Sequence, residues 1–448
     1  GNRYFFAKGK LKMDDYNKKY QEWLNNPNFD EETKEELKSI EGNEEEIKDR
    51  FYKELEFGTA GLRGIVGVGT NRMNKYTVGK ASQGLAEYII KMGGQEKGVA
   101  IAYDSRNMST EFSELAALTL NANGIKTYIF ESLRPTPELS FAVRKLGCIS
   151  GIVVTASHNP PKYNGYKVYW EDGAQITEPI DMGIITEVNS ITDFSKIKTI
   201  SKDEAIKKGL YNVISLDMDT MYLEELKRNT LNQDAINKVA KDLKIVYTPL
   251  HGTGGKLVKR LFEELGYKQV YIVKEQEEPD GSFPTVSYPN PEDPKSFEYA
   301  LNLAKQVDAD IILANDPDAD RIGLHVKDSK TGDFYKWENV GQKRAIFISR
   351  LDDEKLPTIE AFIEFCQEKR IEFDIAGEQN LTNKIIPYLI KKYNLSGENF
   401  IGSVDTISFL KSNREKYAFV GGVGLVEFIL ILVSHVRYPR EMVFRGSV

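Results

Sequence analysis

The sequence predicts an α/β protein built from tandem α/β domains with mixed, mostly parallel sheets. Short apolar segments alternate with helical patterns after about residue 57, and this alternation weakens near 195–215 and restarts near residue 243. The chain has 448 residues, of which 41% are hydrophobic and 28% are charged. A chain of this length and composition can bury several cores, and about three domains are expected.

The N-terminal residues differ in composition from the rest of the chain. Residues 13–56 are charged and helix-prone, with an acidic capping signal at 30–32, so we expect a short helical extension there. Met13 opens the acidic part of this extension, and we expect the native start at that methionine, with residues 1–12 as additional sequence.

The elements of the two α/β blocks follow from the spacing of apolar residues. In the first block we expect a strand over 99–103, a helix over 110–123, a strand over 126–130, a helix over 137–146 and a strand over 149–155. In the second block we expect a strand over 243–248, a helix over 254–265, a strand over 269–274, a helix over 295–306 and a strand over 310–314. The two blocks look like two copies of one α/β pattern.

A third region begins near residue 333. Helices are expected over 340–351 and 357–369, whereas its strands are less distinct. The expected domains are a helical extension, two α/β domains and a partial or divergent third domain, with bounds 1–56, 57–203, 204–332 and 333–448.

Composition excludes several classes of function. The formal net charge is −7, which disfavours a general nucleic-acid-binding face. Cys148 and Cys366 provide neither a disulfide framework nor a thiolate zinc site, and they fit a reducing cytoplasm. The most apolar run, 428–433, is far shorter than the roughly 20 residues that span a bilayer. We therefore expect a cytoplasmic protein without nucleic-acid or membrane partners, and the sequence favours no particular oligomeric state.

A serine-containing cluster follows the expected strand 149–155. It has the sequence Thr-Ala-Ser-His-Asn-Pro over 155–160, and Lys167 lies ten residues beyond Ser157. Backbone donors and a nearby cation would offset the charge of a phosphoryl group on that serine. From the local residue types alone, an ordinary turn is the stronger interpretation. A serine hydrolase is disfavoured because no Gly-x-Ser-x-Gly turn is present.

An acidic cluster follows the expected strand 310–314. Asp316, Asp318 and Asp320 alternate along the chain, so their carboxylates can converge on one hard cation. An EF-hand would need Gly and Glu at the sixth and twelfth positions, where this chain has Arg321 and Lys327. Mg²⁺ therefore suits the cluster better than Ca²⁺, and a solvated acidic turn is the alternative.

Further polar clusters lie at turns. A glycine-rich segment over 57–64 carries Arg63, whose guanidinium could bind a phosphate. Arg106 follows the expected strand 99–103. An Arg-Pro-Thr-Pro segment occupies 134–137, for which a rigid turn before a helix and a functional role are equally good interpretations. The segment His-Gly-Thr-Gly-Gly over 251–255 could cradle a phosphate at a helix start, but a plain strand-to-helix turn is the stronger interpretation.

Taken in order, these clusters resemble those of the α-D-phosphohexomutases, the phosphoglucomutases and phosphomannomutases. The resemblance rests on the arginine-bearing glycine loop, on 155–160 and on Asp-Pro-Asp-Ala-Asp-Arg over 316–321. The flanking segments 163–167 and 248–253 look like the phosphoglucomutase-2-like branch, and the likeness covers about residues 13–330. It implies the family's fold of tandem α/β domains around a cleft.

The resemblance also implies roles for particular residues. Ser157 would be the phosphorylated serine, and its oxygen would bind Mg²⁺ together with Asp316, Asp318 and Asp320. Lys167 would be a nearby cation and a candidate proton shuttle, and His158 would help to shape the loop. The other expected contacts to phosphates are Arg63, Arg106 and Arg321.

The activity implied is the interconversion of hexose 1-phosphate and hexose 6-phosphate, with glucose as the favoured sugar. Phosphoserine would donate its group, a 1,6-bisphosphate would turn over in the cleft, and its other phosphate would return to the serine. Glucose 1,6-bisphosphate is the expected activator, and no nucleotide is needed.

The resemblance weakens beyond about residue 335. The family's sugar-selecting Gly-x-Glu-Glu-Ser loop has no counterpart after 416–420, where the chain reads Gly-Gly-Val-Gly-Leu. The Arg-x-Ser-Gly-Thr loop of a fourth domain is also not found. We therefore expect a chain that lacks the fourth domain and has reduced activity, because remote phosphate contacts contribute to transition-state binding. A sugar-phosphate binder or a slow phosphatase is the alternative.

Overall fold

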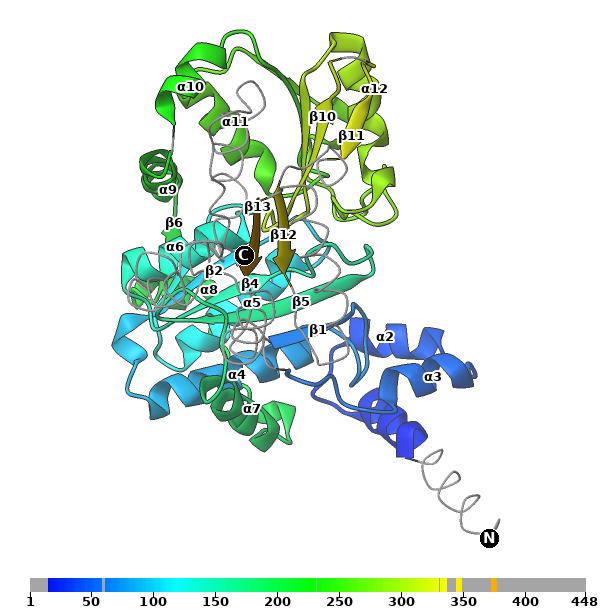
Figure 1. Cartoon of the computed structure of the whole chain (residues 1–448). Helices are drawn as coiled ribbons and strands as arrows, with labels where there is room; N and C mark the ends of the chain where they lie inside the picture. Colours follow the sequence, from blue (N-terminus) through cyan, green and yellow to red (C-terminus); the bar gives the residue numbers. More distant parts are fainter. Residues whose placement is uncertain are drawn as a thin grey trace, which may run out of the picture.

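A computed structural model of the chain describes residues 15–58, 61–230, 232–329 and 331–336, together with the backbone of two short strands at 344–348 and 372–376. The first α/β domain, blue through cyan to green in Figure 1, lies against the second, which is green to yellow. The N-terminal helices extend from the first domain on the side away from the second.

The first sheet has six strands in the order β1-β5-β4-β2-β3-β6. Strands β4, β2, β3 and β6 are parallel, whereas β5 is antiparallel to both of its neighbours. The strands are β1 (Gly61–Ile65), β2 (Val99–Tyr103), β3 (Thr127–Phe130), β4 (Ser150–Val154), β5 (Tyr163–Trp170) and β6 (Tyr211–Ile214). The helices are α4 (Lys75–Lys91), α5 (Ser109–Ala122), α6 (Thr136–Leu146), α7 (Ile180–Ser190) and α8 (Lys202–Lys207).

Helices cover both faces of this sheet. Along β2, Val99 and Ile101 belong to the core that includes α4 and α5, while Ala100 and Ala102 belong to the core that includes α6. Such alternation is what a strand shows when both faces are buried, because successive side chains point to opposite faces. Helix α6 has proline in its first turn and ends at Gly147, whose φ of 67° is the left-handed conformation of a helix C-cap.

The second sheet has five strands in the order β11-β10-β9-β7-β8. Strands β9, β7 and β8 are parallel, and β10 is antiparallel to β9 and β11. The strands are β7 (Lys244–Thr248), β8 (Gln269–Ile272), β9 (Ile311–Asn315), β10 (Ile322–Lys327) and β11 (Phe334–Lys336). The helices are α9 (Leu216–Arg228), α10 (Gln233–Val239), α11 (Gly254–Glu264) and α12 (Glu298–Val307).

The two domains share one apolar core. A single cluster of buried side chains contains Leu139 and Val153 of the first domain, Tyr222 of α9, and Ile245 and Leu257 of the second domain. Helix α9 contacts α6 of the first domain and α11 of the second, and the shared core holds the domains against each other.

The N-terminal extension is helical, with a helix over 15–25, α2 (Glu31–Ser39) and α3 (Glu44–Phe51). Its aromatic cluster includes Trp23, whose ring contacts Phe29, Phe51 and Tyr76. Because Tyr76 lies in α4, this cluster attaches the extension to the first domain.

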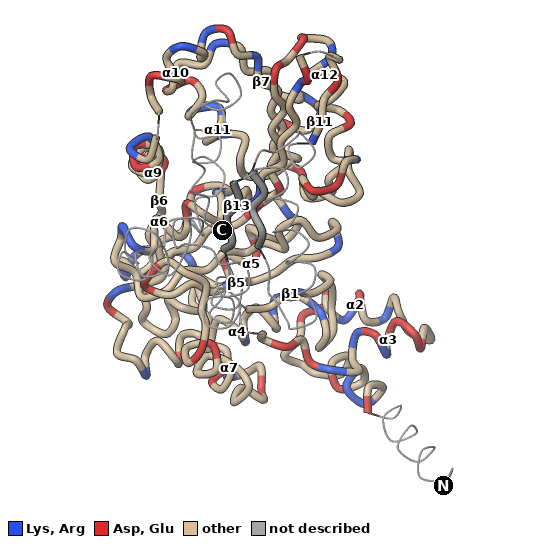
Figure 2. The backbone as a smooth tube through the Cα atoms, viewed as in Figure 1, with Lys and Arg blue, Asp and Glu red and all other residues tan. Residues whose placement is uncertain are grey.

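Lysine and arginine alternate with aspartate and glutamate along the domains and the N-terminal helices (Figure 2). Among the described helices, none is both long and apolar enough to cross a lipid bilayer.

The α/β fold with mixed sheets is confirmed, and the strands expected in both blocks form within two residues of their expected bounds. The expected division at 203/204 is corrected, because β6 pairs with β3 and so belongs to the first sheet. The four-residue β6 has a half-exposed, partly polar pattern that does not stand out from a loop.

The helix expected over 340–351 is wrong. Residues Arg344–Ile348 form strand β12, which pairs in parallel with β13 (Glu372–Ala376). A short apolar run is compatible with a buried strand as well as with a helix, and length is the only discriminator within the segment itself. The helix expected over 357–369 and the segments at 416–425 and 428–433 lie outside the described residues.

Candidate active site

Two loops occupy equivalent places in the two sheets. The serine loop (residues 155–162) joins β4 to β5, and the acidic loop (residues 316–321) joins β9 to β10. In each case a parallel strand ends, the loop follows, and the chain returns as an antiparallel strand. Ligands of open α/β sheets bind beyond the carboxyl ends of such strands. Both loops are therefore placed where a site is expected.

The serine loop holds Ser157 in an uncommon backbone conformation. Its φ is 52°, in the left-handed region that few residues other than glycine adopt. The Ser157 amide donates a hydrogen bond to Thr155 Oγ1 over 2.8 Å, and the Thr155 hydroxyl donates to Asp104 Oδ2 over 2.6 Å. The buried carboxylate of Asp104 thus stabilises the turn through Thr155. Ser157 itself is only 4% exposed.

Arg106 fastens the rest of the serine loop. Its guanidinium donates hydrogen bonds to the backbone carbonyls of Ser157 (2.6 Å), Pro160 (2.9 Å) and Tyr163 (3.1 Å), and to that of Asn159. The guanidinium is fully buried and also lies 3.3 Å from an oxygen of Asp104. We expected Arg106 to contact a bound phosphate. The structure instead places its guanidinium against the backbone of the loop, where its terminal nitrogens donate to carbonyl oxygens.

The acidic loop brings its three carboxylates together. Oxygen atoms of Asp316, Asp318 and Asp320 all lie within 4.8 Å of one another, and Asp316 and Asp318 are fully buried. Within the described part of the chain, Asp318 Oδ1 and Asp320 Oδ1 are buried without a hydrogen-bond partner. Buried carboxylate oxygens without donors are costly unless a cation satisfies them. These residues therefore fit a hard divalent ion such as Mg²⁺.

The two loops touch each other across the domain boundary. The Ser157 hydroxyl donates to Asp316 Oδ2 over 2.8 Å, and Lys167 Nζ lies 2.9 Å from Asp318 Oδ2 and 3.7 Å from Asp320 Oδ2. The Thr136 hydroxyl, at the start of α6, donates to Asp318 Oδ2 over 2.9 Å. The first domain thus supplies two hydroxyl groups and an ammonium group to the acidic loop of the second.

The electrostatics of the acidic loop follow from burial and mutual repulsion. Burial raises the pKa of Asp316 well above its usual range, and the charges of Asp318 and Asp320 raise it further. Burial and the charge of Asp318 likewise raise the pKa of Asp320. Burial is the largest influence on Asp318 and favours a higher pKa, but the charge of Lys167 and the hydrogen bonds with Asp316, Lys167 and Thr136 together outweigh it and hold this pKa below its usual range. One lysine therefore faces three clustered carboxyl groups.

His158 lies beside the serine, with Nδ1 3.2 Å from Ser157 Oγ. Because the Ser157 hydroxyl donates to Asp316, this contact requires Nδ1 to carry the proton and donate to the serine oxygen. Burial, followed by the charges of Arg321 and Arg63, lowers the pKa of His158, so its ring is neutral near pH 7.

Two expected cations lie at the edge of this group. The Arg321 amide donates to Asp316 Oδ1 over 3.1 Å, while its half-exposed guanidinium pairs with Glu292 over 3.2 Å. Arg63 is exposed on β1, opposite Gly165 of β5. The structure therefore brings together Ser157, His158, Lys167 and the three aspartates, with Arg321 and Arg63 on the periphery.

Some residues of this neighbourhood carried only a weak signal in the sequence. Thr136 belongs to the Arg-Pro-Thr-Pro segment, for which a rigid turn and a functional role were equally good interpretations. Tyr288 lies in the turn-rich segment 277–294, and its ring stands edge-on to that of His158 at 5.5 Å. Proline, glycine and asparagine in such a segment indicate turns, but they do not indicate which other loop the turns contact.

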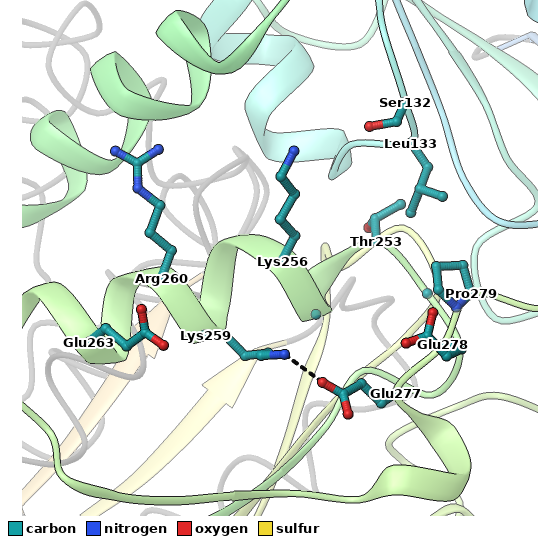
Figure 3. Close-up of a pocket in the computed structure, with 12 residues that line it drawn as sticks. Ser132, Leu133, Thr253, Lys256, Lys259, Arg260, Glu263, Glu277, Glu278 and Pro279 are labelled. Carbon is teal, nitrogen blue, oxygen red and sulfur yellow. Dashed lines mark hydrogen bonds and ion pairs between the residues drawn. The ribbon is translucent and has the colours of Figure 1, made fainter.

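A cavity of about 520 Å³ lies near the acidic loop and is lined by both domains (Figure 3). Ser132 and Leu133 come from the first domain, and the remaining lining comes from the turn before α11, from α11 itself and from 277–279. The segment 251–255 forms the turn between β7 and α11, as the sequence favoured. The charged lining residues have both signs: Lys256, Lys259, Arg260, Glu263, Glu277 and Glu278.

Comparison with known families gives two matches along the chain. Residues 54–194 match "Phosphoglucomutase/phosphomannomutase, alpha/beta/alpha domain I", and residues 220–331 match the corresponding domain II. Together the matches span more than half of the chain, and they include the serine loop and the acidic loop. Domain II begins after β6, as the sheet pairing requires.

Individual relatives agree with these matches. A phosphoglucomutase from Staphylococcus epidermidis is 38% identical over 292 residues, covering 65% of this chain and 52% of that protein. A human phosphopentomutase is 39% identical over 297 residues, covering 64% of this chain and 48% of that protein. The chain spans about half the length of the curated relatives it matches.

A solved structure shows the same fold. The open form of a phosphoglucomutase from Paramecium superimposes with a TM-score of 0.52 at 19% identity, covering 76% of this chain and 64% of that one.

Proposed function

Because the chain belongs to the α-D-phosphohexomutase family of phosphoglucomutases and phosphomannomutases, we propose that it transfers a phosphoryl group between Ser157 and a sugar phosphate. The observation that carries this proposal is the contact between the two loops, with the Ser157 hydroxyl 2.8 Å from Asp316 inside a triad of carboxylates. A phosphoryl group on this oxygen would lie beside the cation site. The proposed reaction is an isomerisation of hexose 1-phosphate and hexose 6-phosphate.

Asp316, Asp318 and Asp320 would hold Mg²⁺ together with an oxygen of phosphoserine 157. When bound, Mg²⁺ would supply positive charge that stabilises the transferring phosphoryl group. The two orphaned carboxylate oxygens support this assignment.

Phosphoserine 157 would transfer its group to a free hydroxyl of the sugar phosphate. The bond between Ser157 Oγ and phosphorus breaks as a new oxygen–phosphorus bond forms on the sugar; the sugar hydroxyl loses its proton and Ser157 Oγ gains one. The other phosphate of the resulting bisphosphate would then return to Ser157 Oγ in the reverse sense, which completes the isomerisation. Lys167, Arg321 and Arg63 are the cations near enough to oppose the charge of the transferring group. A further role for Lys167 as proton shuttle would require its ammonium to leave Asp318.

Arg106 would act without touching the substrate. Its four bonds to carbonyls set the course of the serine loop and hence the direction of the Ser157 hydroxyl. His158 would orient the same oxygen through Nδ1. Such preorganisation reduces the rearrangement needed when the phosphoryl group is transferred.

Glucose phosphate is the first substrate to test, with glucose 1,6-bisphosphate as the proposed source of the initial phosphoryl group. The names of the relatives divide between phosphoglucomutase and phosphopentomutase. Ribose 1-phosphate is therefore the matched competitor. A cytoplasmic location is part of the same proposal.

The test combines intact-protein mass with an isomerase assay. The full chain is incubated with Mg²⁺ and glucose 1,6-bisphosphate, and turnover of glucose 1-phosphate and ribose 1-phosphate is followed. We expect an added mass of about 80 Da for one phosphoryl group that is absent from Ser157→Ala and present in Ser195→Ala, an exposed serine of the same domain.

Three outcomes separate the candidate activities. Phosphorylation with isomerisation supports a mutase. Phosphorylation followed only by release of inorganic phosphate supports the slow phosphatase, because water then accepts the group. Absence of any phosphorylated serine contradicts phosphoryl transfer and favours a sugar-phosphate binder.

A further inference from the structure

A segment of the second domain crosses to the serine loop of the first. This bridging segment (residues 277–292) has no regular secondary structure and lies between the short helices η3 (Lys274–Gln276) and η4 (Pro294–Phe297). Its beginning is fastened to its own domain, since Glu277 pairs over 2.5 Å with Lys259 (Figure 3). Glu277 also pairs with Lys274 over 2.5 Å.

His251 holds the middle of the bridging segment. Its Nδ1 lies 3.1 Å from the carbonyl oxygen of Glu278, and its Nε2 lies 2.9 Å from Thr285 Oγ1. A carbonyl can only accept, so Nδ1 carries the proton and the Thr285 hydroxyl donates to Nε2. Thr285 Oγ1 in turn accepts from Gln276 Nε2 over 3.0 Å. The hydrogen bonds of this network are therefore satisfied by one assignment of donors and acceptors. Together they hold the bridging segment in one conformation.

The far side of the bridging segment contacts the supports of the serine loop. The Phe283 ring lies 5.0 Å from the guanidinium carbon of Arg106, the residue that binds three carbonyls of that loop and a fourth at the start of β5. The Tyr288 ring stands edge-on to His158, which is bonded to Ser157 Oγ. Gly281 lies so close to the first domain that an added Cβ would be 2.4 Å from the Asn107 amide nitrogen.

We propose that the bridging segment positions the phosphoryl-carrying serine from across the domain boundary, with Tyr288 and Thr285 as positioning residues. Tyr288 limits the rotation of His158, and Thr285 fixes the segment that carries Tyr288. The effect that we expect on phosphorylation of Ser157 rests on the proposed function. The structural consequence of the inference, an ordered serine loop, does not depend on that function.

The test compares Tyr288→Leu and Thr285→Val with the conservative variant Tyr288→Phe. Hydrogen exchange of the amides in 155–162 is measured by mass spectrometry on the full chain, and phosphorylation of Ser157 by glucose 1,6-bisphosphate is timed in parallel. Tyr288→Leu and Thr285→Val are expected to speed this exchange and to slow phosphorylation by roughly 10- to 100-fold, the cost of a misplacement of about 1 Å. Tyr288→Phe keeps the ring edge and should match the unmodified chain.

Two further variants make the result decisive. Gly281→Ala separates the surfaces by steric contact with Asn107, without removing a hydrogen bond, and should speed exchange in 155–162 as Tyr288→Leu does. Tyr299→Leu, on α12 of the same domain and 38% exposed, should change neither readout.

Unchanged exchange at 155–162 in Tyr288→Leu, Thr285→Val and Gly281→Ala would overturn the inference. Faster exchange in a chain whose serine accepts no phosphoryl group would uphold the positioning and contradict the proposed function instead.

Discussion

The serine loop and the acidic loop have the same place in their sheets but different kinds of support. The backbone of the serine loop takes its hydrogen bonds mainly from its own domain, where Arg106 binds its carbonyls and Asp104 supports its turn. The carboxylates of the acidic loop are matched mainly from the other domain, by the Ser157 hydroxyl, the Thr136 hydroxyl and the Lys167 ammonium. Each loop also has one non-glycine residue with positive φ, Ser157 at 52° and Ala319 at 54°.

This difference separates two properties of the loops: the backbone conformation of the serine loop depends mainly on its own domain, whereas the charge balance of the acidic loop depends on the other domain. A single buried guanidinium of the same domain can fix the backbone conformation of a loop, because one arginine side chain donates to several carbonyls. Charge balance in a dense group of carboxylates requires cations or donors from outside the group. We therefore expect substitutions at the acidic loop to affect ion binding most, and substitutions around the serine loop to affect stability and order.

The largest effect is expected for Asp318→Asn, which removes the carboxylate that Lys167 and Thr136 both contact. Binding of Mg²⁺, followed by calorimetric titration, should weaken by at least roughly 10- to 100-fold, the loss usual for residues one shell beyond the ligands. Asp308→Asn, an exposed carboxylate of the same domain, is the matched control and should bind as the unmodified chain does. Equal affinity in Asp318→Asn would remove Asp318 from the cation site.

Arg106→Met tests whether the serine loop is supported from within its domain. It leaves the buried Asp104 carboxylate without its cation and frees four carbonyls, so the free energy of unfolding should fall by about 3–5 kcal/mol. Urea denaturation measures this change, with Arg228→Met on the exposed face of α9 as the control. A decrease of less than about 1 kcal/mol in the free energy of unfolding would show that residues other than Arg106 support the loop.

Thr136→Val probes the cross-domain bond with a side chain of similar shape. Loss of a hydrogen bond to an ionised acceptor should cost about 1.5–3 kcal/mol in the free energy of unfolding. In the double variant with Asp318→Asn the two costs should not add, because both substitutions remove the same contact. Strict additivity would show that the two residues act independently.

Glu138→Gln should give the smallest effect, visible in the pH dependence of stability. Burial and the charge of Asp219 raise the pKa of Glu138 well above its usual range, against the opposing charges of Arg134 and Lys256. The folded chain therefore keeps a proton that the unfolded chain releases, and stability falls as pH rises from the unfolded pKa through the folded pKa. The variant lacks this decline, so its stability relative to the unmodified chain should increase between pH 5 and pH 8 in urea titrations. Parallel pH profiles would contradict a raised pKa for Glu138.

Much of the candidate site could be predicted because its two loops directly follow long apolar strands. The strand 149–155 located Ser157, the strand 310–314 located the three aspartates, and the alternation with helices indicated that both strands end on a binding edge. The strand β6 was missed because it has only four residues, two buried and two not, which do not form a clear pattern. The role expected for Arg106 differed from its placement, because a buried and an exposed arginine after a strand look alike in sequence.

Strand periodicity along this chain identifies two α/β domains, because periodicity is a property of short segments. The order of its short motifs adds a candidate phosphoserine and a candidate magnesium loop through their resemblance to those of the phosphohexomutases. The neighbours of those groups depend on folding. Thr136 is 182 residues from Asp318, and Tyr288 lies in a turn-rich segment that reaches His158 only across the domain boundary. Contacts of this kind form when two sheets pack around a shared core. The sequence of one segment therefore does not indicate which distant segment it will contact.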